Sequence, residues 1–291
     1  MNGDGQIDIL SGSYSRMDRS MAGLFQVLWG NGKGGFRAAK ALEGTDGKPL
    51  IIAVDNPKDP DLPRICTRPT AVDLDGDGKL DIVSGNFEGT FVLFRGEGRG
   101  RFAPRSTRLV SKSGKPLKVD AHSDPFFIDW DGDGDLDLVS GSSGGSVYLF
   151  RNEGSKTKPS FADSITLFRP AKHPMSPDGI TLGSAHITGP GHAVRVFVAD
   201  VDEDGKLDLL LGDSVTIYAP AKGLTEAAVH ERMKSWSKKQ EALGKEMAQA
   251  QRSKDNPRIR SAQKAYSAHW KAREKICSSD MTGFVWLLRQ K

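Results

Sequence analysis

The chain has little cysteine, no long apolar run and no visible leader segment. Its 291 residues include two cysteines, Cys66 and Cys277, too few for a disulfide scaffold. The sequence leaves open whether they pair, which requires the root of the insertion described below to lie near the entry to the second repeat. No run of about 20 apolar residues is present, so we expect no membrane span. No signal peptide is visible either.

What the chain has instead is an acidic nine-residue loop that occurs four times. The complete copies begin at Asp73, Asp129 and Asp200, and a shortened copy occupies residues 2–8. Oxygen-bearing side chains recur at positions 1, 3, 5 and 9, and Gly at position 6 allows a sharp turn.

Clustered carboxylates repel one another unless a cation lies between them. Oxygen ligands at this spacing suit a hard divalent ion, above all Ca²⁺, in the three complete loops and the shortened one. Acidic turns that stay solvated are the alternative. The predicted side-chain ligands are Asn2, Asp4, Asp8, Asp73, Asp75, Asp77, Asp81, Asp129, Asp131, Asp133, Asp137, Asp200, Asp202, Asp204 and Asp208. The predicted backbone carbonyl ligands, at position 7, are those of Gln6, Lys79, Asp135 and Lys206.

These loops connect strands and not helices. An EF-hand loop needs Glu at position 12 and a helix after it, whereas position 12 here is Ser84, Ser140 or Leu211. Each loop is followed by a short apolar run that ends in Gly, which is typical of a buried strand. The predicted strands after the loops are residues 7–12, 80–85, 136–141 and 207–212.

The repeat extends past the loop. A third strand is predicted at residues 23–29, 89–95 and 145–151, each followed by a turn and a Phe. The complete loops begin 56 and 71 residues apart. A period near 60 residues with three to four short strands is typical of propeller blades, which bury their faces against neighbouring blades.

The repeated Asp-x-Asp-Gly-Asp-Gly-x-Leu-Asp loop with its Gly-ended strand resembles the FG-GAP/VCBS repeats, whose fold is the β-propeller found in integrin α heads. The resemblance covers about residues 1–220 and 278–291, with Phe-Ala-Pro at 102–104 and Phe-Ala-Asp at 161–163 in the name-giving position. It implies an all-β propeller with Ca²⁺ in each blade's hairpin loop. It also implies a secreted, periplasmic or cell-surface setting and an adhesive or ligand-presenting role, without naming a ligand.

Two parts of the chain depart from this pattern. Met1 falls inside the first loop, so we expect an N-terminally truncated chain with further blades upstream; closure with four blades is the alternative. Residues 221–277 carry apolar residues at helical spacing on both sides of a Pro-containing break at 255–257. We therefore predict blades over 1–220, a helical-hairpin insertion at 221–277, and a returning strand of the last blade at 278–291.

The net charge of +4 conceals an uneven distribution. The four loops hold 16 of the 37 acidic residues, whereas residues 221–277 carry 14 Lys and Arg against 6 Asp and Glu. A basic helical surface suits an anionic polysaccharide, a lipid surface or nucleic acid, and a solvated helix face is the plain alternative. No nucleic-acid motif accompanies the charge, so we expect no nucleic acid partner.

Two short motifs suggest enzymes but fit hairpin turns. Residues 30–35 match G-x-G-x-x-G, yet the equivalent turns lead into a strand and not into the helix that dinucleotide binding needs. Residues 141–145 match G-x-S-x-G, but the equivalent segment 85–89 has no central Ser. The sequence thus predicts a non-enzymatic, calcium-binding adhesion or carbohydrate-binding module. The alternatives are an accessory propeller of a secreted polysaccharide-degrading enzyme and an assembly protein whose helices dock a partner.

Overall fold

The computed structural model describes residues 1–14, 23–52, 64–170 and 180–291. The predicted repeat region therefore includes three stretches, 15–22, 53–63 and 171–179, that lie outside the described residues. The chain divides into two compact units. The first spans residues 1–170, 190–213 and 284–291, and the second contains residues 180–189 and 214–283 of the described chain.

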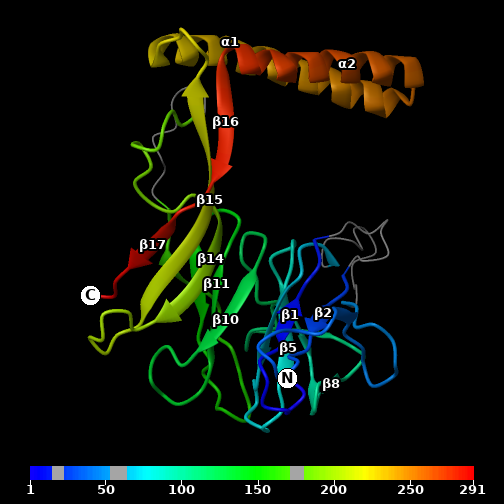
Figure 1. Cartoon of the computed structure of the whole chain (residues 1–291), viewed down its shortest axis with the longest axis vertical. Helices are drawn as coiled ribbons and strands as arrows, with labels where there is room; N and C mark the ends of the chain where they lie inside the picture. Colours follow the sequence, from blue (N-terminus) through cyan, green and yellow to red (C-terminus); the bar gives the residue numbers. More distant parts are fainter. Residues whose placement is uncertain (15–22, 53–63, 171–179) are drawn as a thin grey trace. The chain divides into compact units, whose positions relative to one another are not determined.

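Short antiparallel strands build the first unit, in sheets that follow one another along the chain (Figure 1). The first sheet contains β1 (Ile9–Ser11), β2 (Gln26–Leu28) and β3 (Lys40–Ala41). The second contains β4 (Arg68–Val72), β5 (Asp81–Gly85), β6 (Phe91–Phe94) and β9 (Thr107–Arg108). The third contains β10 (Asp124–Ile128), β11 (Asp137–Gly141), β12 (Val147–Phe150) and β13 (Ile165–Phe168). The fourth contains β14 (His192–Ala199), β15 (Asp208–Pro220) and β17 (Val285–Leu288), and β7 (Gly96–Gly98) pairs with β8 (Arg101–Phe102) in a small hairpin.

The cores of the first unit lie between consecutive sheets. Side chains alternate between the two faces of a strand, so neighbouring residues of β5 enter different cores. Ile82 packs with Phe25 of the first sheet, whereas Val83 packs with Leu138 and Phe150 of the third. A third core joins β11 and β12 to β14 and β15. Because both faces of β5 and β11 are buried, each sheet depends on the sheets beside it.

Glycine at the end of the strand that follows each of the first three acidic loops lets neighbouring sheets approach closely. A Cβ on Gly85 would overlap the carbonyl of Ser123, at the start of the third sheet. In the same way, a Cβ on Gly12 would overlap Thr67, and a Cβ on Gly141 would overlap Val194.

The chain is mainly β and is built of several antiparallel sheets. None of the sheets formed by the described residues closes on itself.

The second unit is a β-ribbon that leads into two helices. The distal half of β15, from Val215 to Pro220, pairs with β16 (Cys277–Thr282). Helix α1 (Glu226–Ser253) and helix α2 (Asn256–Ala272) follow the ribbon, and a short 3-10 turn, η2 (Arg273–Lys275), returns the chain to β16. The second unit is thus wider than the predicted insertion at 221–277, because the ribbon continues the strand pairing on both sides of the helices.

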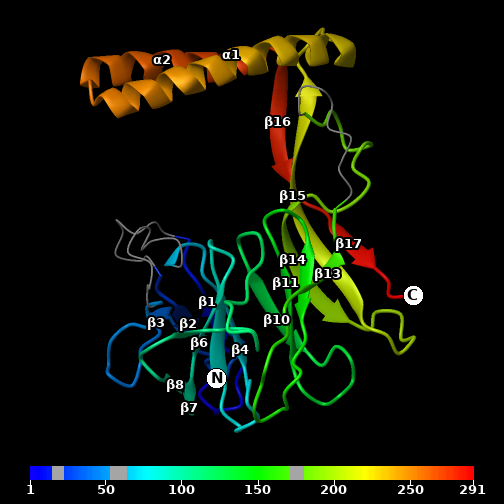
Figure 2. The same ribbon diagram turned by 180° about the vertical axis from the view of Figure 1, so that it is seen from behind.

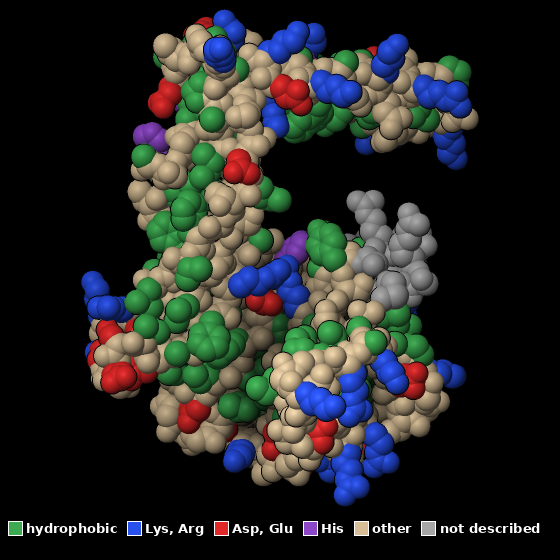
Figure 3. Space-filling model, in the orientation of Figure 1, with side chains coloured by type: hydrophobic (Ala, Val, Ile, Leu, Met, Phe, Trp, Pro, Cys, Tyr) green, Lys and Arg blue, Asp and Glu red, His purple; other side chains and the backbone are tan. Residues whose placement is uncertain are grey.

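The helices begin and end at residues with suitable backbone conformations. Thr225 caps α1 by accepting a hydrogen bond from the Ala228 N–H at 3.3 Å, and Lys254 ends α1 in the left-handed conformation with φ 56°. Pro257 lies in the first turn of α2, where its missing N–H costs no hydrogen bond. Several Lys and Arg side chains lie along the face of the helices that Figure 3 shows. No helix in the described ranges combines the length and apolarity needed to span a membrane.

The two cysteines lie in different cores. Cys66 is buried in the first unit, and Cys277 is buried in the second, with its Sγ 3.7 Å from Met233 Sδ. No disulfide joins them, so the pairing that the sequence left open is not formed.

Candidate metal centres

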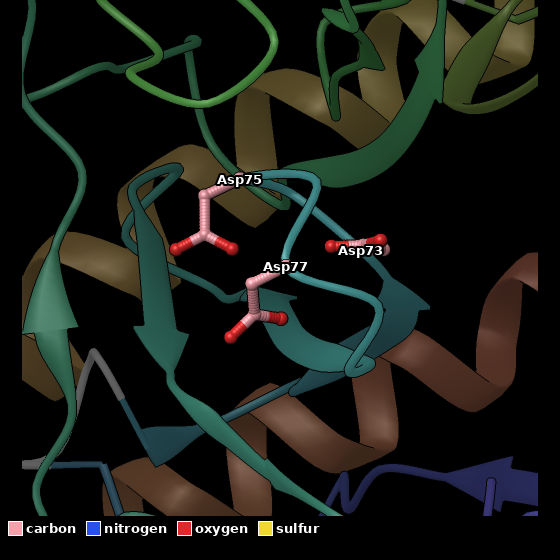
Figure 4. A group of neighbouring side chains, drawn as sticks. All are labelled: Asp73, Asp75 and Asp77. Atoms are coloured by element: carbon pink, nitrogen blue, oxygen red, sulfur yellow. The ribbon is translucent and has the colours of Figure 1, made fainter.

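Each complete acidic loop joins the first two strands of a sheet. The loops lie between β4 and β5, between β10 and β11, and between β14 and β15, as the predicted strand positions require. In each loop three carboxylates place one oxygen apiece within 4.8 Å of the others. The groups are Asp73, Asp75 and Asp77; Asp129, Asp131 and Asp137; and Asp200, Asp202 and Asp208. Figure 4 shows the first group arranged around one turn of its loop.

The aspartate at position 1 shapes the loop through backbone hydrogen bonds. Asp129 accepts from the N–H groups of Gly132, Asp133 and Gly134 at 2.8, 3.1 and 2.9 Å. Asp200 accepts from the N–H groups of the equivalent positions 5 and 6 at 3.1 and 2.9 Å. The Gly at position 6 has a positive φ in every complete loop, 92° at Gly134, which other residues rarely adopt. These bonds hold the loop around its carboxylates.

The aspartate at position 9 fastens the loop to the sheet. Asp137 is fully buried and accepts from the N–H of Trp130 at 2.8 Å and from the N–H of Asn152 at 2.7 Å. Asp208 makes the same two kinds of bond, from the N–H of Val201 at 3.1 Å and from that of Gln290 at 3.0 Å. Burial raises the pKa of Asp137, against the lowering effect of the backbone donors. The aspartate at position 9 therefore holds the loop to the sheet, in addition to its predicted role as a metal ligand.

In each complete loop an arginine pairs with the aspartate at position 3. The sequence analysis did not identify these arginines. The pairs are Arg95 with Asp75 at 2.7 Å, Arg151 with Asp131 at 3.4 Å, and Arg289 with Asp202 at 3.3 Å. Each arginine follows the third strand of its sheet. The signal that identifies them is their recurrence at one position of the repeat.

Two carboxylate oxygens within these loops lack donors. Asp73 Oδ1 and Asp135 Oδ1 are buried and have no hydrogen-bond partner in the structure. Burial raises the pKa of Asp135, and the neighbouring carboxylates of Asp133 and Asp137 raise it further. Buried oxygens without donors, beside carboxylates that repel one another, fit the oxygen ligands of a hard divalent cation.

The other predicted ligands are carboxylates inside the groups, carboxylates outside them, and the position 7 backbone carbonyls. Asp77 belongs to a carboxylate group, but its counterparts Asp133 and Asp204 lie outside the groups, as does Asp81 at position 9. Lys79 directs its ammonium to Asp77 at 2.8 Å, and hydrogen bonds from its side chain and backbone lower the pKa of Asp77. The position 7 carbonyls of Gln6, Lys79, Asp135 and Lys206 remain predicted ligands.

The shortened first loop is poorer in carboxylates. Asn2 stands at position 3, where the complete loops have Asp, and its Oδ1 accepts from the N–H of Asp4 at 3.1 Å. The N–H of Gln6 donates to Asp4 at 2.9 Å, and that of Gly30 donates to Asp8 at 2.9 Å. Within the described residues this loop forms no group of three clustered ligands. It keeps the turn and the position 9 attachment of the other loops.

The comparison with protein families agrees with this geometry. Residues 73–122 and 129–211 match the family model of the FG-GAP-like repeat, and these two segments contain all three complete acidic loops. These two segments are thus FG-GAP-like repeats. No curated protein matches it.

Proposed function

We propose that this FG-GAP repeat protein is a non-enzymatic, calcium-stabilised binding module that works outside the cytoplasm, and that its four sheets are consecutive propeller blades. The observation that carries the proposal is the recurrence of three carboxylate groups whose oxygens lie within 4.8 Å of one another. Such groups are unfavourable without a cation. The burial of each sheet against the next supports the propeller arrangement.

Calcium suits these loops better than magnesium. Each loop offers several carboxylate oxygens together with backbone carbonyls, and Ca²⁺ takes six to eight oxygen ligands in flexible geometry. Mg²⁺ demands a near-ideal octahedron and retains several waters. The loop carboxylates are partly exposed, which agrees with modest affinity and with the millimolar Ca²⁺ found outside cells.

Calcium would hold the protein together and leave the chemistry of binding to other residues. Asp73, Asp75 and Asp77 would bind the ion in the first complete loop. The clustered carboxylates of the other two loops, Asp129, Asp131 and Asp137 and then Asp200, Asp202 and Asp208, would bind it there. A bound cation neutralises the aspartates and locks the hairpin between the first two strands of each sheet. Carboxylates held by a cation are poor general acids or bases, which supports a binding role, for a protein or polysaccharide ligand, over a catalytic one.

Equilibrium calcium binding tests this proposal. Isothermal titration calorimetry of the full chain should give three Ca²⁺ per chain, one for each complete loop. Tb³⁺, which replaces Ca²⁺, should show luminescence sensitised by Trp130 at position 2 of the second loop. Trp130→Phe should remove that signal and leave the Ca²⁺ stoichiometry unchanged. If no Ca²⁺ bound to the chain at millimolar concentration, the proposed role would be excluded.

A further inference from the structure

We propose that a groove between the first sheet and the β7–β8 hairpin binds an acidic sugar, a pyranose ring that carries a carboxylate. This inference rests on the proposed binding role and assigns it a place and a ligand class. The groove has a volume of about 600 Å³ and lies between β2, the segment that begins at β3, and the β7–β8 hairpin. A bridge between Gly44 and Phe102 holds the two sides together, and Figure 2 labels the strands around it.

Trp29 is the residue that distinguishes this groove from the rest of the repeat. It follows the third strand-like segment of its repeat, at the position occupied by Arg95, Arg151 and Arg289 in the others. Those arginines pair with the aspartate at position 3 of their loops, whereas the first loop has the neutral Asn2 there. The first repeat thus has neutral residues at both of these positions, and the large aromatic ring of Trp29 lines the groove.

The backbone of the β7–β8 hairpin makes room for the ring. Gly100 lines the groove with φ 71°, and a Cβ there would lie 2.8 Å from Trp29 Cη2. The ring of Trp29 therefore lies directly against the turn of the β7–β8 hairpin. Trp29 also packs on the core between the first and second sheets, and this packing fixes the orientation of its ring.

Within the described part of the chain, the charged side chains of the groove form no ion pairs with protein groups. Lys40, Glu43 and Arg101 line it and are exposed. Among the described residues none of the three forms an ion pair. Two cations and one carboxylate are therefore directed to solvent around an aromatic wall. A ligand pocket typically combines apolar lining with a few polar groups of this kind.

This combination fits an acidic sugar better than the other ligands with a flat face. The C–H face of a pyranose packs on an aromatic ring, and the buried side chains of Val27 and Leu42 extend the apolar wall. Lys40 and Arg101 suit the carboxylate, since Arg binds carboxylates through two parallel hydrogen bonds. Glu43 can accept hydrogen bonds from sugar hydroxyls, and it repels the single charge of a sugar carboxylate less than the nearly double charge of a nucleotide phosphate.

Calorimetric titration of the full chain in Ca²⁺ tests the proposal. The probes are the trisaccharide of galacturonic acid, its monosaccharide, the neutral trisaccharide maltotriose, and AMP. We expect the acidic trisaccharide to bind about tenfold or more tightly than maltotriose. Trp29→Ala and the double variant Lys40→Ala/Arg101→Ala should each weaken binding by about tenfold or more. Lys33→Ala, at an exposed turn of the same sheet outside the groove, is the matched control and should bind like the wild type.

Each outcome decides the proposal. Equal affinity for maltotriose, tighter binding of AMP, no heat with either acidic sugar, or full binding by the double variant would each overturn it. Because Trp29 also packs on the core, the unfolding curve of Trp29→Ala is recorded with it, and the surface double variant decides if that variant unfolds. The titration is repeated in EDTA. Sugar binding without calcium stabilisation would refute the calcium role alone, whereas calcium stabilisation without sugar binding would refute this inference alone.

Discussion

Arg95 Nη1 lies 2.7 Å from Asp75 Oδ2 and 3.1 Å from Asp81 Oδ2, so one guanidinium contacts two aspartates of the same loop. Arg151 and Arg289 hold the same place at the other two complete loops. An arginine beside the carboxylates reduces their mutual repulsion while no metal ion is bound. The positive guanidinium also opposes the binding of a metal ion, because both interact with the same carboxylates.

The first prediction concerns this arginine. Its side chain is 45% exposed, so the ion pair is worth at most about 1 kcal/mol. Arg95→Gln should therefore raise the Ca²⁺ affinity of its loop by about two- to fivefold. Calorimetry measures this, with Arg105→Gln as the control for a change in net charge. A weaker affinity in Arg95→Gln would show that the arginine supports the site and does not compete with it.

The second prediction concerns the close approach of the sheets. Gly85→Ala puts a Cβ onto the Ser123 carbonyl and should lower the free energy of unfolding by about 1–3 kcal/mol. Gly212→Ala is the matched control, because its Cβ would meet only Arg195 Cβ, at 3.9 Å. Urea unfolding of the two variants gives the comparison. Equal stabilities would mean that the second and third sheets do not pack as described.

The third prediction separates the structural task of position 9 from metal binding. Asp137→Ala leaves the buried N–H groups of Trp130 and Asn152 without an acceptor and should cost roughly 2–4 kcal/mol in EDTA. Asp133→Ala should cost less than about 1 kcal/mol, because exposed Asp133 accepts only from the N–H of Asp135. Equal losses in EDTA would contradict the structural role.

The fourth prediction is a pH dependence that arises from Asp124. Burial raises its pKa to about 6, although Arg68 lowers it and Arg195 Nη1 lies 3.8 Å from its Oδ1. The folded state therefore binds this proton more tightly than the unfolded state, in which the pKa is about 4. The contribution of Asp124 to the free energy of unfolding should fall by up to about 3 kcal/mol as the pH rises from about 4 to about 6.

The Asn variant of this residue provides the check. Asp124→Asn should remove that fall, so its stability relative to the wild type should increase between pH 4 and pH 8. Asp46→Asn, at an exposed turn, should follow the wild-type profile. Parallel profiles for wild type and Asp124→Asn would show that the carboxyl does not titrate in this range.

Local patterns in the sequence predicted the strands and the helix break. The segments predicted at 80–85 and 136–141 contain β5 and β11, because Gly at their ends and apolar residues within them are local signals. Pro257 located the break between α1 and α2, because proline fits the first turn of a helix and is unfavourable in a helix interior. The β-rich class and the FG-GAP repeat follow from the same recurring loop.

Features that depend on pairing between distant residues were not predictable. The pairing of β15 with β16 joins Val215 to Thr282, and β16 is mostly polar and exposed, so it carries little apolar alternation. The arginine pairs also needed the fold, because Arg95 and Asp75 are 20 residues apart and meet only when the sheet forms. The groove at Trp29 depends on Gly100, a residue of the neighbouring sheet.

Thermal unfolding in EDTA, in millimolar Ca²⁺ and in millimolar Mg²⁺ tests the central claim most directly. A site saturated a hundredfold above its Kd stabilises the native state by about 2.7 kcal/mol. We predict that Ca²⁺ raises the Tm more than Mg²⁺ does. The rise should shrink stepwise through Asp75→Asn, Asp131→Asn and Asp202→Asn in combination, and Asp46→Asn should leave it unchanged. The same Tm in EDTA and in Ca²⁺ would contradict the assignment of these loops as calcium sites.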